Sequence, residues 1–169
     1  MRKILVLFIS VFLSLNAFAA GGDGGGSSGS GGGSSHSNDS MYDQGIKLVK
    51  RAGKLEKKDK ADKAKKLYSQ AFKKFEKAYS KDNKNPDVLN YLGFTSRKSG
   101  NFTEAEDYYL KGLSLDPKHN GINEYLGELY VQTDRIDKAN ERLEVLKNCN
   151  CEEYEELKAI IAGEKVSKY

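Results

Sequence analysis

One unit of a repeat is visible at residues 85–117, which read NPDVLNYLGFTSRKSGNFTEAEDYYLKGLSLDP. Four of its positions recur thirty-four residues later: Leu92, Gly93, Ala105 and Tyr109 correspond to Leu126, Gly127, Ala139 and Leu143. A period of this length is typical of helical hairpins stacked into a solenoid. Such stacks form an extended concave surface and no enclosed pocket, so the spacing indicates a protein that binds other proteins.

Each unit carries the signals for two helices. Asn85 and Pro86 are typical of a helix start, and Gly100 lies in the turn before a second helix. Glycine inside a helix costs about 1 kcal/mol relative to alanine. Its presence at both Gly93 and Gly127 therefore predicts buried positions where neighbouring helices approach closely.

These residues resemble the tetratricopeptide repeat family, whose Leu-Gly pair, Ala-x-x-x-aromatic spacing and closing proline recur almost throughout residues 85–117. Ser96 stands where that family prefers an aromatic residue. The resemblance covers about three quarters of the chain and implies a small exported bacterial member of the family. The implied fold is all-α: a short right-handed superhelical solenoid of about three helical hairpins plus a C-terminal capping helix.

The repeats divide the domain at residues 41–169 into four parts. A degenerate first repeat at 41–84 aligns Ala64 with Ala105, so seven extra residues, about two turns, lengthen its second helix. The second repeat occupies 85–118, the third 119–151 and the capping helix 152–163. Asn150 and Glu153 have the spacing of a capping box at the start of that last helix.

The N-terminal residues 1–20 have the features of a secretory signal peptide. Arg2 and Lys3 precede an apolar run at 4–15, and the small residues Ala17 and Ala19 mark a cleavage site. We expect cleavage, no stable membrane span in the mature chain, and a periplasmic or secreted location. An uncleaved anchor is the alternative. Residues 21–40 are a Gly/Ser-rich segment that predicts a disordered linker.

Charge is distributed unevenly along the domain. Residues 43–84 hold fifteen Lys/Arg against six Asp/Glu, a balance of +9, whereas residues 121–164 hold five against eleven, a balance of −6. The basic half is nearly all lysine, without the arginine forks and exposed aromatics typical of nucleic-acid binding, so no nucleic acid is expected. Weak attraction to anionic membrane or cell-wall surfaces remains an alternative.

Two cysteines, Cys149 and Cys151, are the only candidates for reactive chemistry. In an exported protein they predict a local disulfide, with inert or intermolecular thiols, redox exchange or metal binding as alternatives. His119 is the one histidine of the domain and is expected in a solvated turn. No catalytic residue, metal site or cofactor is predicted, and the chain is not expected to be an enzyme.

The resemblance implies that a ligand lies against the first helix of each hairpin. Asn90 would hydrogen-bond a peptide backbone, Phe94 would supply an apolar contact, and Arg97 with Lys98 would hold a carboxylate. Glu124 and Glu128 oppose recognition of a terminal carboxylate and favour a ligand with its own basic residue. The outward-facing groove positions are Val49, Glu56, Lys57, Asn90, Phe94, Arg97, Lys98, Glu124, Glu128, Val131 and Gln132.

The leading hypothesis is a non-catalytic scaffold or adaptor that binds a peptide or protein partner in this groove. Two alternatives stay open: a small thiol redox or metal-handling protein that uses Cys149 and Cys151, and an envelope-surface structural protein.

Overall fold

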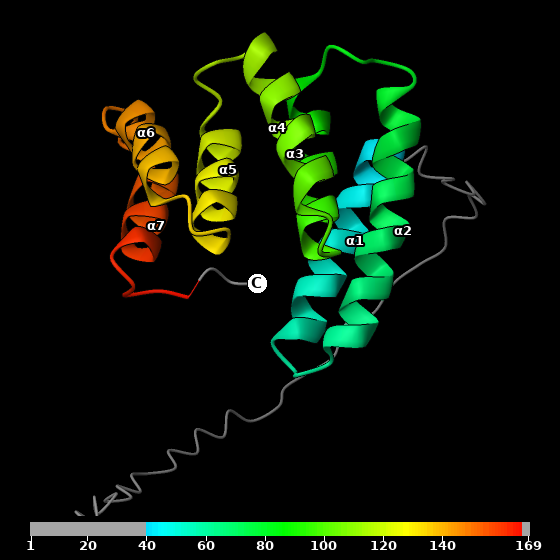
Figure 1. The fold of residues 1–169 in the computed structure, drawn as a ribbon. Helices are drawn as coiled ribbons and strands as arrows, with labels where there is room; N and C mark the ends of the chain where they lie inside the picture. The colour runs from blue at the N-terminus through cyan, green and yellow to red at the C-terminus, as the bar shows by residue number, and fades with distance from the viewer. Residues whose placement is uncertain (1–39, 167–169) are drawn as a thin grey trace, which may run out of the picture. The chain divides into compact units, whose positions relative to one another are not determined.

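The computed structural model describes residues 40–166 of the chain. The predicted signal peptide and all of the predicted linker except Ser40 lie outside these residues. The described part contains seven α-helices and no strand (Figure 1). In chain order they are α1 (Met41–Glu56), α2 (Ala61–Tyr79), α3 (Pro86–Lys98), α4 (Phe102–Leu115), α5 (Asn120–Gln132), α6 (Ile136–Leu146) and α7 (Glu152–Ile161).

The helices pack as three hairpins followed by a final helix. Helix α1 packs on α2, α3 on α4, and α5 on α6, while α2 contacts α3 and α4 contacts α5. Helix α7 covers α5 and α6, as expected of a capping helix. The predicted all-α stack of three hairpins and a C-terminal helix is therefore confirmed.

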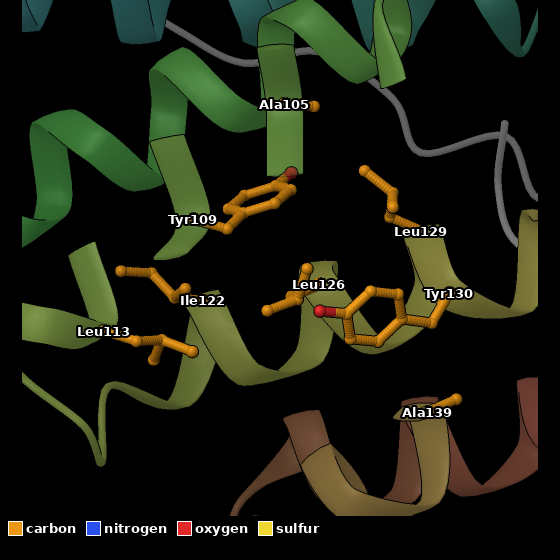
Figure 2. Packing of buried hydrophobic residues seen from close by; sticks show 8 residues of the cluster. All are labelled: Ala105, Tyr109, Leu113, Ile122, Leu126, Leu129, Tyr130 and Ala139. Carbon is orange, nitrogen blue, oxygen red and sulfur yellow. The ribbon is translucent and has the colours of Figure 1, made fainter. Parts of the chain in front are cut away.

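An apolar cluster joins the second and third hairpins. Figure 2 shows Tyr109 and Leu113 of α4 facing Ile122 and Leu126 of α5. The side chains of Tyr109, Ile122 and Leu126 are fully buried. Burying a leucine or isoleucine side chain contributes about 1.5–3 kcal/mol, so this seam holds the second and third hairpins together.

Both glycines of the repeated Leu-Gly pair are buried at close contacts, as predicted. A Cβ atom built on Gly93 would lie 2.5 Å from the ring of Tyr109, and one on Gly127 would lie 2.5 Å from Leu157. Only the absence of a side chain lets these neighbours pack directly against the helix backbone.

The predicted alignment of the first repeat is wrong. Gly45 packs against Phe75, with a Cβ position 2.5 Å from its ring, in the same way that Gly93 packs against Tyr109. Phe75 lies thirty-four residues before Tyr109, so Ala71, and not Ala64, is the counterpart of Ala105. The extra residues therefore lie on both sides of the first hairpin's turn: α1 and α2 have 16 and 19 residues, against 13 and 14 in α3 and α4.

The helix starts follow the predictions in the second hairpin but not at α7. The Asn85 side chain accepts hydrogen bonds from the backbone N–H groups of Asp87, at 2.9 Å, and Val88, at 3.3 Å, as an N-cap does. The predicted capping box of Asn150 and Glu153 is absent, because α7 begins one residue later with Cys151 at its N-cap. Asn150 has a φ of 50°, the left-handed conformation that asparagine tolerates in turns.

Candidate functional site

A hollow of about 490 Å³ lies among helices α1, α3, α5 and α7, and we call it the groove. Its lining consists of an aromatic and apolar floor with charged residues along two sides. Helices α1 and α2 contribute Val49, Lys50, Gly53, Lys54, Lys57 and Tyr68; α3 contributes Tyr91 and Phe94; α5 and α7 contribute Glu124, Tyr125, Glu128, Glu156 and Ile160.

The floor of the groove is a series of aromatic rings in mutual contact. The ring centroids of Phe94 and Tyr125 are 5.1 Å apart, those of Phe94 and Tyr68 are 5.8 Å apart, and those of Phe94 and Tyr91 are 6.4 Å apart. Edge-to-face and tilted contacts of this kind stabilise ring positions by about 0.5–1.5 kcal/mol each. Phe94 is 5% exposed, so its ring packs in the core and also forms part of the groove floor.

Arg97, expected to face a ligand, is buried against this floor. Its guanidinium lies 5.9 Å from the ring centroid of Phe94 and 5.7 Å from that of Tyr125. Its Nη1 atom donates to Glu128 Oε2 at 3.0 Å and to Gln132 Oε1 at 3.1 Å. The positive charge of Arg97 is therefore used within the fold, where it neutralises a carboxylate that is itself buried.

Lys98 is also held inside the structure. Its ammonium forms an ion pair with Glu56, whose other oxygen accepts a hydrogen bond from the Tyr68 hydroxyl at 2.8 Å. Burial lowers the pKa of Lys98 to about 8, and the pairing with Glu56 opposes this shift. The expectation that Arg97 and Lys98 together hold a ligand carboxylate is thus not met, because both cations have carboxylate partners on neighbouring helices.

Asn90 is not part of the groove lining either. The residue is 6% exposed and lies beside Gly121 at the start of α5: a Cβ atom on that glycine would be 2.9 Å from the Asn90 side-chain nitrogen. The side chain therefore packs between hairpins and does not line the groove.

The groove has two walls of opposite charge, which we define here. The lysine wall consists of Lys50, Lys54 and Lys57, all exposed and all on or directly after α1. The glutamate wall consists of Glu124, Glu128 and Glu156 on α5 and α7. A second recess of about 230 Å³ adjoins it and is lined by Glu124, Tyr125, Glu152, Glu153 and Glu156.

The pKa of Glu124, a carboxyl group of the glutamate wall, is shifted by its surroundings. Burial raises its pKa to about 8, and the negative charges of Glu128, Glu153 and Glu156 add to the shift. Arg97 acts in the opposite direction, but its contribution is the smaller one. In the free protein Glu124 therefore largely keeps its proton at neutral pH, and a cation placed beside it would favour its charged form.

Five of the eleven predicted groove positions line the observed groove: Val49, Lys57, Phe94, Glu124 and Glu128. Glu56, Asn90, Arg97 and Lys98 pack internally, Val131 packs against the core of the second and third hairpins, and Gln132 accepts a hydrogen bond from Arg97. The residues that the prediction missed include Lys50 and Lys54, whose spacing with Lys57 on one helix face could have revealed them. Glu156 and Ile160 were missed because α7 was assigned only a capping role.

The remaining predicted residues lie elsewhere. Cys149 and Cys151 form a disulfide with Cα atoms 5.2 Å apart, and neither lines the groove. Within residues 40–166, no group of three or more His, Cys, Asp or Glu side chains is arranged to hold a metal ion.

His119 is the N-cap residue of α5 and not a free side chain in a turn. Its Nδ1 atom accepts a hydrogen bond from the Ile122 backbone N–H at 3.2 Å, and its Nε2 atom lies 3.2 Å from Asp87 Oδ1. An accepting Nδ1 places the ring proton on Nε2, where it points to Asp87. Nδ1 therefore caps α5, and Nε2 links the third hairpin to Asp87 of the second.

The sequence of residues 86–119 matches the family model of the tetratricopeptide repeat. The matched segment comprises α3 and α4, and it supplies Tyr91 and Phe94 to the groove floor. No curated protein matches the chain in sequence.

Several solved structures are similar to the chain, among them tetratricopeptide repeat domains. The second such domain of the human RPAP3 protein, in complex with an HSP70 peptide, is 17% identical over 72% of this chain and 98% of that chain, with a TM-score of 0.45. The type III secretion chaperone SycD of Yersinia enterocolitica, in complex with a peptide of the translocator YopD, is 19% identical over 72% and 88%, with a TM-score of 0.46. The Sgt2 domain from Aspergillus fumigatus is 19% identical over 72% and 78%, with a TM-score of 0.46.

Proposed function

We propose that the protein is a non-catalytic interaction module that binds an extended peptide segment of a partner protein in the groove. The observation that supports this most strongly is the open hollow of about 490 Å³ whose floor is built from Tyr91, Phe94 and Tyr125. Aromatic side chains offer a large contact area at low entropic cost, which suits them to bind peptide side chains. The match of residues 86–119 to the tetratricopeptide repeat family model agrees with this role.

Gly53 allows a direct test of the groove. It lines the groove from α1, and a Cβ atom built on it would meet only the Tyr68 hydroxyl, at 4.0 Å. Replacing Gly53 by glutamine therefore adds a side chain at the groove lining, and its Cβ atom meets no close neighbour. Because the position is inside a helix, the same change should raise the free energy of unfolding by about 0.5–1 kcal/mol.

The test uses the full chain and an array of immobilised twelve-residue peptides of randomised sequence. We expect a subset of peptides to bind the unchanged protein and to lose binding to the Gly53→Gln variant. Ser69→Gln is the matched control, because Ser69 is exposed on α2 outside the groove. Equal binding by both variants would place the interaction elsewhere on the surface, and the absence of any binding peptide would contradict the proposal.

We also propose that the protein acts in the periplasm or outside the cell, on the basis of residues 1–20. Along residues 40–166, no helix has the length and apolar character needed to cross a membrane. The mass of the protein recovered from its source tests this proposal. Loss of about twenty N-terminal residues is the expected result, and an intact N-terminus would contradict it.

A further inference from the structure

The two walls of the groove differ in how far the fold neutralises them. On the lysine wall, Lys50, Lys54 and Lys57 form no ion pair with any described residue. The one acidic side chain in this stretch of α1, Glu56, is already paired with Lys98. The lysine wall therefore presents positive charge to whatever occupies the groove.

The glutamate wall is neutralised only in part. Arg97 pairs with Glu128 at 3.0 Å, and Lys165 pairs with Glu156 at 2.6 Å. Glu124 and the neighbouring Glu152 and Glu153 of the adjoining recess form no ion pair among the described residues, and no lysine or arginine lines that recess. Burial, and then repulsion from the neighbouring carboxylates, raises the pKa of Glu124, and a cationic group in the recess would oppose both effects by favouring the charged carboxylate.

We infer that the groove selects an extended peptide segment of mixed charge: an Asp or Glu side chain lies against the lysine wall, and a Lys or Arg side chain lies against the glutamate wall. This inference rests on the proposed function and names the class of partner. The aromatic floor between the walls would receive the apolar side chains of the same segment.

The spacing between the two charges of the segment follows from the arrangement of the helices. Helix α3 lies between α1 and α5, which carry most of the two walls (Figure 1). A helix with its side chains is about 10–12 Å across, so the walls on the two sides of α3 are at least about that far apart. An extended chain advances about 3.3 Å per residue, so an acidic and a basic side chain with four residues between them are about 17 Å apart and can reach both walls.

Uniformly charged partners are disfavoured by the same arrangement. A polyanion such as a nucleic acid would be attracted by the lysine wall but repelled by the glutamate wall. A polybasic segment would be attracted by the glutamate wall but repelled by the lysine wall. The two walls together therefore lower the affinity for polyanions and for polybasic segments.

The test measures binding of four synthetic peptides to the full chain by fluorescence anisotropy at low salt. Two peptides carry Glu and Lys separated by four residues of alternating Leu and Ala, one with Glu first and one with Lys first. Both orders are needed, because the direction in which the peptide runs along the groove decides which charge meets which wall. The other two carry Glu at both positions or Lys at both. We expect at least one mixed peptide to bind about tenfold more tightly than either uniform peptide, and the difference to shrink at high salt.

A charge exchange between protein and peptide makes the test specific. Lys54→Glu should lower the affinity for the mixed peptide about fivefold or more, and it should raise the affinity for the peptide with Lys at both positions. Lys73→Glu is the matched control, since Lys73 is exposed on α2 away from the groove, and it should change each affinity less than about twofold.

The outcomes separate this inference from the proposed function. Equal affinity for all four peptides, with binding lost in Gly53→Gln, would overturn the charge selection and leave groove binding intact. Weakening by Lys54→Glu and Lys73→Glu alike would also overturn it, because the effect would then follow net charge. Failure of every peptide to bind would overturn both.

Discussion

Arg97 Nη1 lies 3.0 Å from Glu128 Oε2, and this pair joins α3 to α5 beneath the groove floor. Their side chains are 0% and 6% exposed, so each charge is desolvated and depends on the other. Replacing Arg97 by methionine should lower the free energy of unfolding by about 3–5 kcal/mol, because it leaves a buried carboxylate without its counter-charge.

The double variant Arg97→Met, Glu128→Gln is the check on that mechanism. It should be more stable than the Arg97→Met single variant, because the uncompensated charge is gone. Urea unfolding of the unchanged protein, both single variants and the double variant completes the cycle. Strictly additive losses would show that the two side chains act independently.

Gly93 and Gly53 should respond to alanine in opposite ways, although both lie inside helices. A Cβ atom on Gly93 would lie 2.5 Å from the buried Tyr109 ring, so Gly93→Ala should destabilise the fold by about 1–3 kcal/mol. Gly53→Ala meets no such neighbour and should stabilise it by about 0.5–1 kcal/mol. Thermal unfolding followed by circular dichroism measures both; the same sign for both changes would contradict the packing described.

Glu124 should make stability depend on pH. Burial, and then Glu128, Glu153 and Glu156, raise its pKa to about 8 in the folded protein, above the value of about 4.3 for an unfolded chain. The folded state therefore binds the proton more tightly, and stability falls as pH rises from about 4.5 to about 8.

The carboxyl group is only partly shielded from solvent, so we expect a fall on the order of 2 kcal/mol across that range. Urea unfolding at several pH values measures it. Glu124→Gln should flatten this part of the profile, whereas Glu155→Gln, an exposed α7 position outside the groove, should not. A profile unchanged by Glu124→Gln would assign the dependence to other groups.

His119 should behave as a helix cap in mutagenesis. His119→Ala removes the acceptor for the Ile122 backbone N–H and should cost about 1 kcal/mol. His119→Asn supplies a side-chain oxygen at the same place and should recover most of that loss. Amide hydrogen exchange at Ile122 is the local readout, and protection unaltered by His119→Ala would rule out the cap.

Reduction of the Cys149–Cys151 disulfide should have a small effect on stability. The bridge closes a loop of three residues, for which the loop-entropy relation gives about 1.6 kcal/mol. We expect dithiothreitol to lower the unfolding temperature by a few degrees while the helical circular dichroism signal is retained. Global unfolding on reduction would show that the bridge holds α7 in place.

The sequence predicts the parts of this fold that depend on local patterns. The period that relates Gly93 to Gly127 identifies the hairpins, and the Asn85 side chain identifies a helix start. The first repeat is harder to align, because extra residues separate Gly45 from its partner Phe75. The period of thirty-four residues therefore relates the second helices of the first two hairpins but not their first helices.

The groove was harder to predict, because its chemistry depends on pairs that are distant in the sequence. Arg97 and Lys98 lie on a helix face that a peptide could contact, and only the three-dimensional structure shows that Glu128 and Glu56 already hold them. The glutamate wall likewise requires Glu156 of α7 to meet Glu124 of α5. Helical periodicity describes one helix at a time and carries no information on such pairs.

The elongated first hairpin supplies core residues and groove residues from the same stretch of chain. From Gly45 to Ala71 there are 26 residues, against 12 from Gly93 to Ala105, so fourteen residues can be regarded as an insertion. Lys54 and Lys57 belong to that insertion, whereas Gly45 and Phe75 lie outside it. About six of these residues lengthen α1 and seven lengthen α2, each close to two full turns, so the packing faces stay in register. The same stretch also carries Ala52, Ala64 and Tyr68, which are buried with Phe94 of the next hairpin. Gain or loss of these turns would therefore change the ligand preference of the groove and its packing together.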